Sequence, residues 1–299
     1  MAIRYDAGEI ITAMVTPFNA KREVDYDRAE SLVKYLLDNG SDSILVAGTT
    51  GENPTLTHEE EQELLSTVKR ASANRCKVIM NASSNCTETA CRTAKMALKE
   101  NVDALLAVVP YYNKPNQEGM FEHFSKIAES TDLPIIIYNI PSRTGANILP
   151  ETVAKLAKKY ENIVAIKQSF PDMDMISEMR CLCPEDFGLY SGDDSLTLPM
   201  LALGANGVIS VASHIYGKEI KSMIRNFKTG EFKAALNMHK KLYPSFKKFF
   251  VAPNPVPIKS VLAHKGLIEE WVRRPLVELT ELEKYEVFTV IDAFNAEEL

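Results

Sequence analysis

Short apolar runs alternate with amphipathic helical patterns along the chain, at a spacing of roughly 25 to 30 residues. This alternation is typical of repeated strand–helix units and of a parallel sheet. Eight runs qualify as strands: Ile10 to Val15, Ser43 to Ala47, Lys77 to Asn81, Ala104 to Val109, Pro134 to Tyr138, Ile163 to Lys167, Gly188 to Ser191 and Gly207 to Ser210.

Eight such units predict an α/β fold, a (β/α)8 TIM barrel with a C-terminal helical extension. Thr57 followed by Glu60 reads as a capping box that begins one helix, Thr57 to Arg70. We expect residues 1–229 to form the catalytic barrel and residues 230–299 to form a helical region, with helices at Glu231 to Phe250 and Glu281 to Ala296. An open doubly wound sheet is the alternative, but no GxGxxG follows the first strand.

Composition narrows the class of protein. The 299 residues carry a net charge of -6 and no basic stretch with interleaved aromatics, which disfavours nucleic acid as a partner. No apolar run approaches the roughly 18 residues of a membrane span, and the N-terminus lacks the pattern of a targeting peptide, so we expect a cytoplasmic protein. The five cysteines have no CxxC spacing and are interpreted as reduced thiols.

Lys167 carries the strongest chemical signal, because it closes the apolar run Ile163 to Ile166. An ammonium group at the end of a buried strand must be paired, neutralised or used covalently. An ordinary lysine is neutral in only about one molecule in 2,500 at pH 7, and desolvation raises that fraction of attacking amine. A lysine that only reaches out to solvent is the structural alternative.

Unusual residues follow several other predicted strands, where a barrel carries its catalytic groups. Each one alone is explained by a turn, a packed aromatic or a surface ion pair. Together they supply an amine, hydroxyls, backbone amides and a guanidinium, which suit aldol chemistry through a lysine imine. The segments are Gly48 to Glu52, Pro110 to Asn113, Tyr138 to Gly145 and Gly192 to Asp194.

The segments GTTGE, PYYNKP, YNIPSRTG, AIK, SGDD and GVISV resemble those of the dihydrodipicolinate synthase family, within the lyases that include N-acetylneuraminate lyase. The likeness covers nearly the whole chain and extends to Pro253 to Lys259. It implies condensation of pyruvate with L-aspartate 4-semialdehyde, the step that leads to diaminopimelate and lysine. It also implies a homo-oligomer, a tetramer built as a dimer of dimers.

The resemblance assigns roles by matching position. Lys167 would form the pyruvate imine, and Thr49, Tyr112 and Tyr138 would form a hydroxyl relay that moves protons. In the family, the tyrosine that matches Tyr112 reaches in from the neighbouring subunit. Because the imine is its own electron sink, no metal and no organic cofactor is expected.

Four further residues match substrate-binding positions. Thr50 would bind the pyruvate carboxylate, the Ile209 carbonyl would lie near the imine, and Gly192 would line the pocket. Arg143 would bind a second carboxylate, which favours the synthase over the sugar-acid lyases. Gln168 follows the lysine where many synthases have an acidic residue, and it should point away from Lys167.

A lysine-inhibition site of the family is matched only in part. His58, Asn85 and Tyr111 agree with it, whereas Thr89 stands where a carboxylate would hold the inhibitor and Glu61 replaces a histidine. The lost charge complementarity predicts weak or absent inhibition by lysine.

Three rival interpretations have less support. Val164 to Lys167 and Asp186 to Gly188 spell the kinase motifs VAIK and DFG, but the glycine-rich loop and His-Arg-Asp are missing. Asp193, Asp194 and the five histidines lack the spacing of a metal site. A regulator that binds a keto acid without turnover would have no need for the residues of the imine chemistry.

Overall fold

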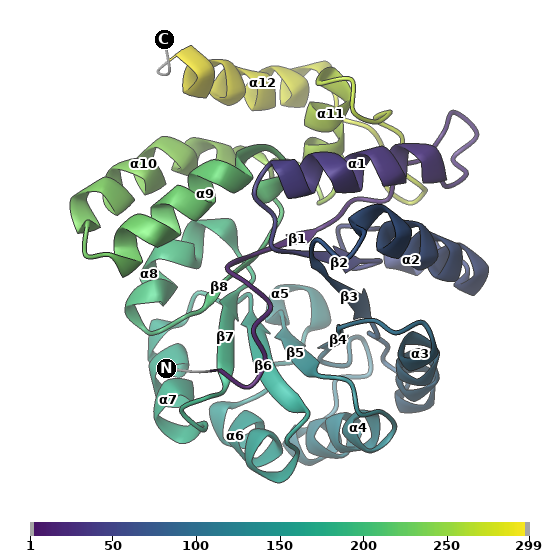
Figure 1. Ribbon diagram of the computed structural model, residues 1–299, viewed down its shortest axis with the longest axis vertical. Helices are drawn as coiled ribbons and strands as arrows, with labels where there is room; N and C mark the ends of the chain where they lie inside the picture. The colour runs from purple at the N-terminus through teal and green to yellow at the C-terminus, as the bar shows by residue number, and fades with distance from the viewer. Residues whose placement is uncertain (1–2, 297–299) are drawn as a thin grey trace. The chain divides into compact units, whose positions relative to one another are not determined.

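The computed structural model describes residues 3–296, and its eight strands follow one another in sequence order around a closed parallel barrel (Figure 1). The fold is a (β/α)8 TIM barrel with additional C-terminal helices, which confirms the predicted class. The strands are β1 (Ile10–Ala13), β2 (Ser43–Val46), β3 (Lys77–Asn81), β4 (Ala104–Val108), β5 (Ile135–Asn139), β6 (Ile163–Gln168), β7 (Gly188–Ser191) and β8 (Gly207–Ser210).

Helices occupy the segments between the strands and most of the C-terminal part of the chain. The helices up to β8 are α1 (Tyr26–Asp38), α2 (His58–Ser72), α3 (Thr87–Lys99), α4 (Gln117–Glu129), α5 (Pro141–Thr144), α6 (Pro150–Lys159), α7 (Met173–Leu182) and α8 (Thr197–Ala202). Those after β8 are α9 (Ser213–Lys228), α10 (Phe232–Lys248), α11 (Val256–His264) and α12 (Glu281–Ala296). Two short 3-10 turns are η1 (Asn53–Thr55) and η2 (Asp194–Leu196).

The predicted strands agree with the observed ones to within one or two residues at either end. The first strand shows why they differ: Val15 is fully buried, but its backbone N–H donates to Nε2 of His214 at 3.2 Å instead of continuing the ladder. Hydrophobicity reports burial, whereas a strand also requires backbone pairing. The capping box at Thr57 and Glu60 is confirmed, because both of its hydrogen bonds form at the start of α2.

The chain divides into two compact units. Unit 1 comprises the residues up to Glu9 together with Lys77–Ile209, and unit 2 comprises Ile10–Cys76 together with the residues from Ser210 onward. In unit 1, α3, α4, α6 and α7 pack each against the next outside the strands (Figure 1). In unit 2, α9 packs against α10, and α12 packs against both α10 and α11. The expected division into residues 1–229 and 230–299 stays a prediction.

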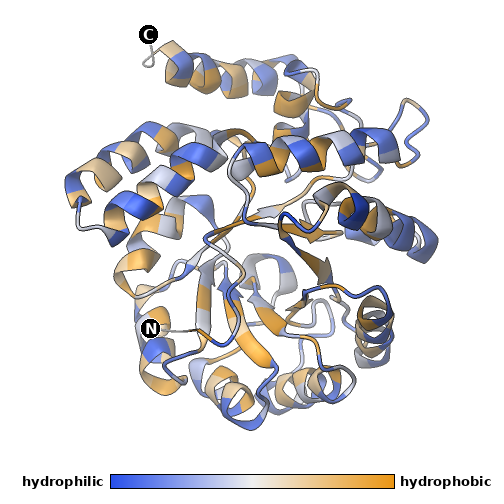
Figure 2. Ribbon diagram, in the orientation of Figure 1, coloured by the Kyte–Doolittle hydropathy of each residue, from blue (hydrophilic) through white to orange (hydrophobic). Residues whose placement is uncertain are grey.

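The strands supply the core. Those of unit 1 are hydrophobic along most of their length, whereas helices such as α1 are apolar on one side and polar on the other (Figure 2). Strands of a parallel barrel have helices on their outer face and packed side chains inside, so both faces favour apolar residues. None of the helices in residues 3–296 combines the length and hydrophobicity that crossing a membrane requires.

Candidate active site

Lys167 is the next-to-last residue of β6, a strand in which every residue is buried. The sheet register pairs it with Tyr138 of β5 and Tyr190 of β7. Its ammonium nitrogen lies 4.2 Å from the centroid of the Tyr138 ring. Among residues 3–296, no carboxylate lies within ion-pair distance of this nitrogen. The amine therefore lies at a strand end, buried against an aromatic ring and without a counter-ion in contact among the described residues.

Burial changes the chemistry of this amine. Desolvation lowers the pKa of Lys167 to about 8, an effect that the charges of Asp194 and Asp193 oppose and that of Arg143 reinforces. With this pKa about one molecule in ten carries the neutral amine at pH 7, so the nucleophile is present without any further base.

Gly192 follows β7 beside the lysine, where its N–H donates to the carbonyl of Gln168 at 2.8 Å. A Cβ atom at position 192 would lie 1.9 Å from Oγ of Ser169 and 2.8 Å from Cε of Lys167. Only glycine fits there without displacing the lysine. The Ser169 hydroxyl is buried and has no hydrogen-bond partner among the described residues, a feature that the motif analysis missed.

Gln168 points away from the amine, as expected from the alternation of a strand. Its side-chain oxygen accepts a hydrogen bond from Asn139 at 3.1 Å, and its amide nitrogen lies 4.0 Å from the sulfur of Met175 in α7. Asn139 and Gln168 thus face the helix layer, while Tyr138 and Lys167 face the barrel interior. Ile209 lies in β8 with its side chain buried.

Arg143 lies in α5, the four-residue helix that follows β5 and ends at Gly145 with a φ of 68°. Its side chain is exposed and has no ion pair or hydrogen bond within residues 3–296. Its charge lowers the pKa of Lys167, in addition to the larger effect of burial. A surface ion pair does not explain this arginine, and its five N–H donors are available to a ligand.

The turn after β4 holds Tyr112 in an unusual position. The Tyr112 side chain is 89% exposed, and its φ of 70° lies in the left-handed region that side chains disfavour. The turn is fixed by Asn113, whose N–H donates to the Tyr111 carbonyl and whose side chain donates to the Asn85 carbonyl, both at 2.8 Å. A strained backbone that holds a solvent-exposed tyrosine is typical of a functional loop.

In unit 2, the loop Gly48–Glu52 follows β2 and carries Thr49 and Thr50. The loop bends sharply because Ala47 and Glu52 have φ values of 52° and 57°, and the N–H of Gly51 donates back to the Gly48 carbonyl at 3.0 Å. Thr50 is buried and its hydroxyl accepts a hydrogen bond from Nδ2 of Asn254 at 2.9 Å. Thr49 is half-buried.

The residues of the expected inhibitor site lie partly in each unit. In unit 2, Nδ1 of His58 lies 3.3 Å from a carboxylate oxygen of Glu61, and burial raises the pKa of Glu61 although His58 opposes the shift. In unit 1, the Thr89 hydroxyl accepts a hydrogen bond from the Arg92 guanidinium at 3.2 Å. Both departures from the family pattern therefore have partners within this chain.

Among the sequence-predicted residues, unit 1 brings Tyr138, Arg143, Lys167 and Gly192 to one cluster, and unit 2 brings Thr49 and Thr50 to one loop. Asp194 also acts on the lysine as a nearby charge that raises its pKa, a role that the sequence motifs do not indicate. Across residues 3–296, no group of three or more His, Cys, Asp or Glu side chains could hold a metal ion. The absence of a metal from the reaction stays a prediction.

The lowered pKa gives a testable pH dependence. Competitive labelling with a small amine-directed reagent, followed by peptide mass spectrometry from pH 6 to 11, should show Lys167 reacting with a midpoint near its pKa of about 8. Asp194→Asn should move that midpoint downward, because a charge that favours the ammonium form is lost. The chain's exposed lysines are the internal control, and a Lys167 midpoint equal to theirs would contradict the effect of burial.

Comparison with known proteins agrees with this geometry. The model of the Dihydrodipicolinate synthetase family matches residues 6–294. A 4-hydroxy-tetrahydrodipicolinate synthase of Desulforamulus reducens is 50% identical over 93% of this chain and 94% of its own. The structure of a synthase from Cyanidioschyzon merolae with lysine bound superposes with a TM-score of 0.95 at 46% identity, covering 97% and 98% of the two chains.

A monomeric dihydrodipicolinate synthase variant has the same fold, with a TM-score of 0.94 at 38% identity and coverage of 96% and 97%. These matches extend over the barrel and the C-terminal helices alike. On sequence, fold and the buried lysine of β6 together, the chain belongs to the dihydrodipicolinate synthetase family.

Proposed function

We propose that this chain condenses pyruvate with L-aspartate 4-semialdehyde through an imine on Lys167, as a lyase of the class I aldolase type. The observation that carries the proposal is the buried amine of Lys167, with its pKa lowered to about 8 and with no ion pair among residues 3–296. The curated relative in Desulforamulus reducens is named for the same synthase. The reaction serves diaminopimelate and lysine synthesis, and we place it in the cytoplasm.

The chemistry follows from the neutral amine. Lys167 attacks the keto carbon of pyruvate, and water leaves as the imine forms. Loss of a methyl proton gives an enamine, whose carbon attacks the aldehyde of the second substrate. The amino group of that substrate then displaces the lysine and closes the ring. Tyr138, Thr49 and Tyr112 are proposed to carry the protons, and no metal or organic cofactor is required.

Substrate binding is proposed to use the residues around the amine and the loop after β2. Thr50 would hold the pyruvate carboxylate, with Gly192 and the Ile209 carbonyl beside the imine. Arg143 would hold the carboxylate of the semialdehyde, and its guanidinium, exposed and without an ion pair in residues 3–296, supports that role. An aldolase that adds pyruvate to a sugar aldehyde is the second candidate, but its aldehyde substrate would not need this cation.

Tyr112 is proposed to act in the site of a neighbouring subunit. Its exposed ring and strained backbone support this role, because a residue used within its own chain would be expected to bury part of its surface. We propose a homotetramer, a dimer of dimers. One relative of the same fold is a monomeric variant.

Reduction with sodium borohydride in the presence of pyruvate tests the proposed function. We expect a single adduct, mapped by peptide mass spectrometry to Lys167, and cyclised product when aspartate semialdehyde is added to unreduced enzyme. Lys167→Arg should give no adduct, and the peptide with the buried Lys259 should stay unlabelled. An adduct without cyclised product would indicate another pyruvate aldolase, and no adduct would refute the imine.

Mixing inactive variants tests the shared site. If Tyr112 serves the partner's lysine, Lys167→Ala and Tyr112→Phe chains in equal amounts should recover about a quarter of the activity, since half of the random dimers hold one intact site. Lys167→Ala mixed with Tyr138→Phe is the control, because both groups would belong to one chain and no rescue is expected. Mixed dimers without activity would place Tyr112 outside the neighbouring site.

Inhibition by lysine is proposed to be weak or absent. Glu61 is already in contact with His58, and Thr89 offers no charge to an ammonium group. Initial rates at saturating pyruvate should change less than twofold up to millimolar lysine. Thr89→Glu should strengthen inhibition by restoring a carboxylate, and saturable inhibition of the unmodified enzyme below 1 mM would contradict the proposal.

A further inference from the structure

Helix α11 contains one charged residue, Lys259, and the Lys259 side chain is fully buried. Its ammonium nitrogen donates to Oε1 of Glu52 at 2.6 Å and to the carbonyl of Trp271 at 2.8 Å, and it lies 4.0 Å from the centroid of the Phe18 ring. A buried ion pair contributes little net stability compared with apolar packing. This pair therefore calls for a role other than stability.

Glu52 connects that helix to the loop after β2. It is the last residue of Gly48–Glu52, is 3% exposed and has left-handed backbone geometry with a φ of 57°. While one carboxylate oxygen binds Lys259, the other accepts a hydrogen bond from the N–H of Arg273 at 2.9 Å. Both oxygens of Glu52 are thus held by residues that follow β8 in the chain, Lys259 in α11 and Arg273 beyond it, within the C-terminal helical part (residues 230–296).

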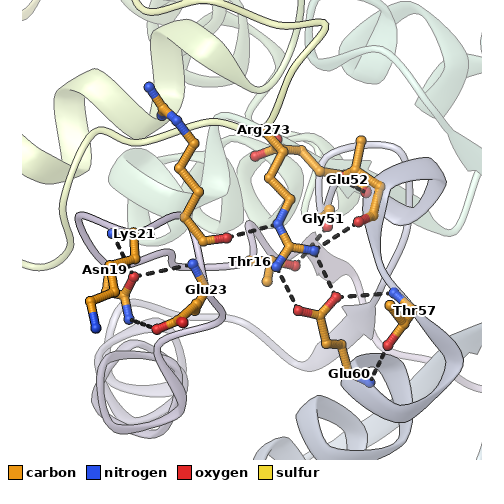
Figure 3. Close-up of polar contacts among 11 residues, drawn as sticks. Thr16, Asn19, Lys21, Glu23, Gly51, Glu52, Thr57, Glu60 and Arg273 are labelled. Atoms are coloured by element: carbon orange, nitrogen blue, oxygen red, sulfur yellow. Dashed lines mark hydrogen bonds and ion pairs between the residues drawn. The ribbon is translucent and has the colours of Figure 1, made fainter.

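Arg273 and Thr16 fix the surroundings of the same loop (Figure 3). The Arg273 guanidinium binds both carboxylate oxygens of Glu60 at 2.5 and 2.6 Å, and it donates to the Thr55 carbonyl at 2.7 Å. The Thr16 hydroxyl donates to the Gly51 carbonyl at 2.6 Å. The loop is therefore restrained at Gly51, at Glu52 and at the start of α2.

Asn254, in the segment just before α11, contacts the loop at Thr50. Its Nδ2 donates to the Thr50 hydroxyl oxygen at 2.9 Å, and the Asn254 side chain is 7% exposed. A hydroxyl that accepts one hydrogen bond must direct its own hydrogen elsewhere. Thr50 is thereby prepared as a donor, which is what a ligand with only acceptor oxygens requires.

We propose that α11 and the segment before it set the geometry of the substrate carboxylate site, with Asn254 directing the Thr50 hydroxyl and the Lys259–Glu52 pair holding the loop. Asn254 and Lys259 are positioning residues, since they act through Thr50 and Glu52. This inference rests on the proposed function, in which Thr50 binds the carboxylate of pyruvate. It gives the C-terminal helices a part in substrate binding.

Asn254→Asp tests the direction of the hydrogen bond. An aspartate of the same shape accepts from Thr50 instead of donating, so the KM for pyruvate should rise roughly 10-fold to 100-fold. The KM for aspartate semialdehyde and the kcat should each change less than threefold. Methyl pyruvate has an ester in place of the carboxylate. The concentration of methyl pyruvate that gives half-maximal borohydride trapping should also change less than threefold. An equal loss for both keto compounds would indicate general damage and would overturn the proposal.

Thr50→Val makes the test specific. Once the hydroxyl is gone, Asn254→Asp should add less than threefold to the KM for pyruvate, because Asn254 acts through Thr50. A large additional loss in the double variant would show that Asn254 acts independently, contrary to the proposal. Asn254→Ala removes the donor without adding a charge, so it should raise the KM for pyruvate by a smaller factor. This variant replaces Asn254→Asp in the test if the aspartate variant does not fold.

The ion pair is tested by removing both charges together. Single changes leave a buried charge unpaired and are expected to lower the Tm strongly, whereas Glu52→Gln with Lys259→Met should retain the fold. In that double variant the KM for pyruvate should rise at least fivefold. Lys248→Met with Glu286→Gln is the matched control, because this pair joins α10 to α12 at 2.8 Å and should leave every KM unchanged.

The outcomes separate the two proposals. A folded Glu52→Gln, Lys259→Met variant with the pyruvate KM of the unmodified enzyme would overturn the role of the pair. An unmodified enzyme that forms no imine with pyruvate would refute the proposed function, and with it the carboxylate site. Imine formation in the unmodified enzyme, combined with no selective effect of Asn254→Asp, would refute only the inference.

Discussion

The cost of removing an ammonium group from water governs the chemistry of this chain, and two lysines meet that cost in different ways. Burial lowers the pKa of both Lys167 and Lys259 to about 8. Lys259 is compensated by a carboxylate, a carbonyl and an aromatic ring, and these contacts require its proton. Lys167 has the Tyr138 ring but no ion pair among the described residues, so the loss of its proton leaves no buried carboxylate without a counter-ion. One lysine is structural and the other is reactive because of this difference in partners.

The rest of the site depends on two loops that have no regular secondary structure over most of their length but are held in place by specific contacts. Ala47, Glu52, Tyr112 and Lys114 all have left-handed φ values, and they lie after β2 or after β4. Such geometry costs free energy, and it persists only where neighbouring contacts determine it. The contacts are present: Asn113 closes one turn onto Asn85, and residues of the C-terminal helical part hold the other. The strands of the barrel provide stiff supports, and these two loops carry the polar groups of the site.

Local patterns in the sequence were sufficient to predict the fold and the reactive amine, but not the hydrogen bonds that connect the loop after β2 to the C-terminal helical part. The eight strands and the capping box depend on residues within a few positions of one another, and Lys167 stands out because it closes an apolar run. The side chains that Asn254, Lys259 and Arg273 bind in and beside the loop after β2 are those of Thr50, Glu52 and Glu60, which lie 204, 207 and 213 positions away in the chain, beyond any periodicity. A signal did exist, since Lys259 is a single charge in an apolar helix, but its partner could not be read from the sequence. Ser169 was missed for a similar reason, because only the folded chain brings its hydroxyl against Gly192.

The contact between Glu52 and Lys259 also has a consequence for how the protein is made. A ribosome releases residue 52 long before residue 259, since 207 positions separate them. Chains emerge at about 5 to 20 residues per second and fold from the N-terminus, so the glutamate waits on the order of ten seconds or more for its cation. The loop after β2 therefore reaches its final shape only after Lys259 has been made, so a segment synthesised early depends on a helix synthesised much later.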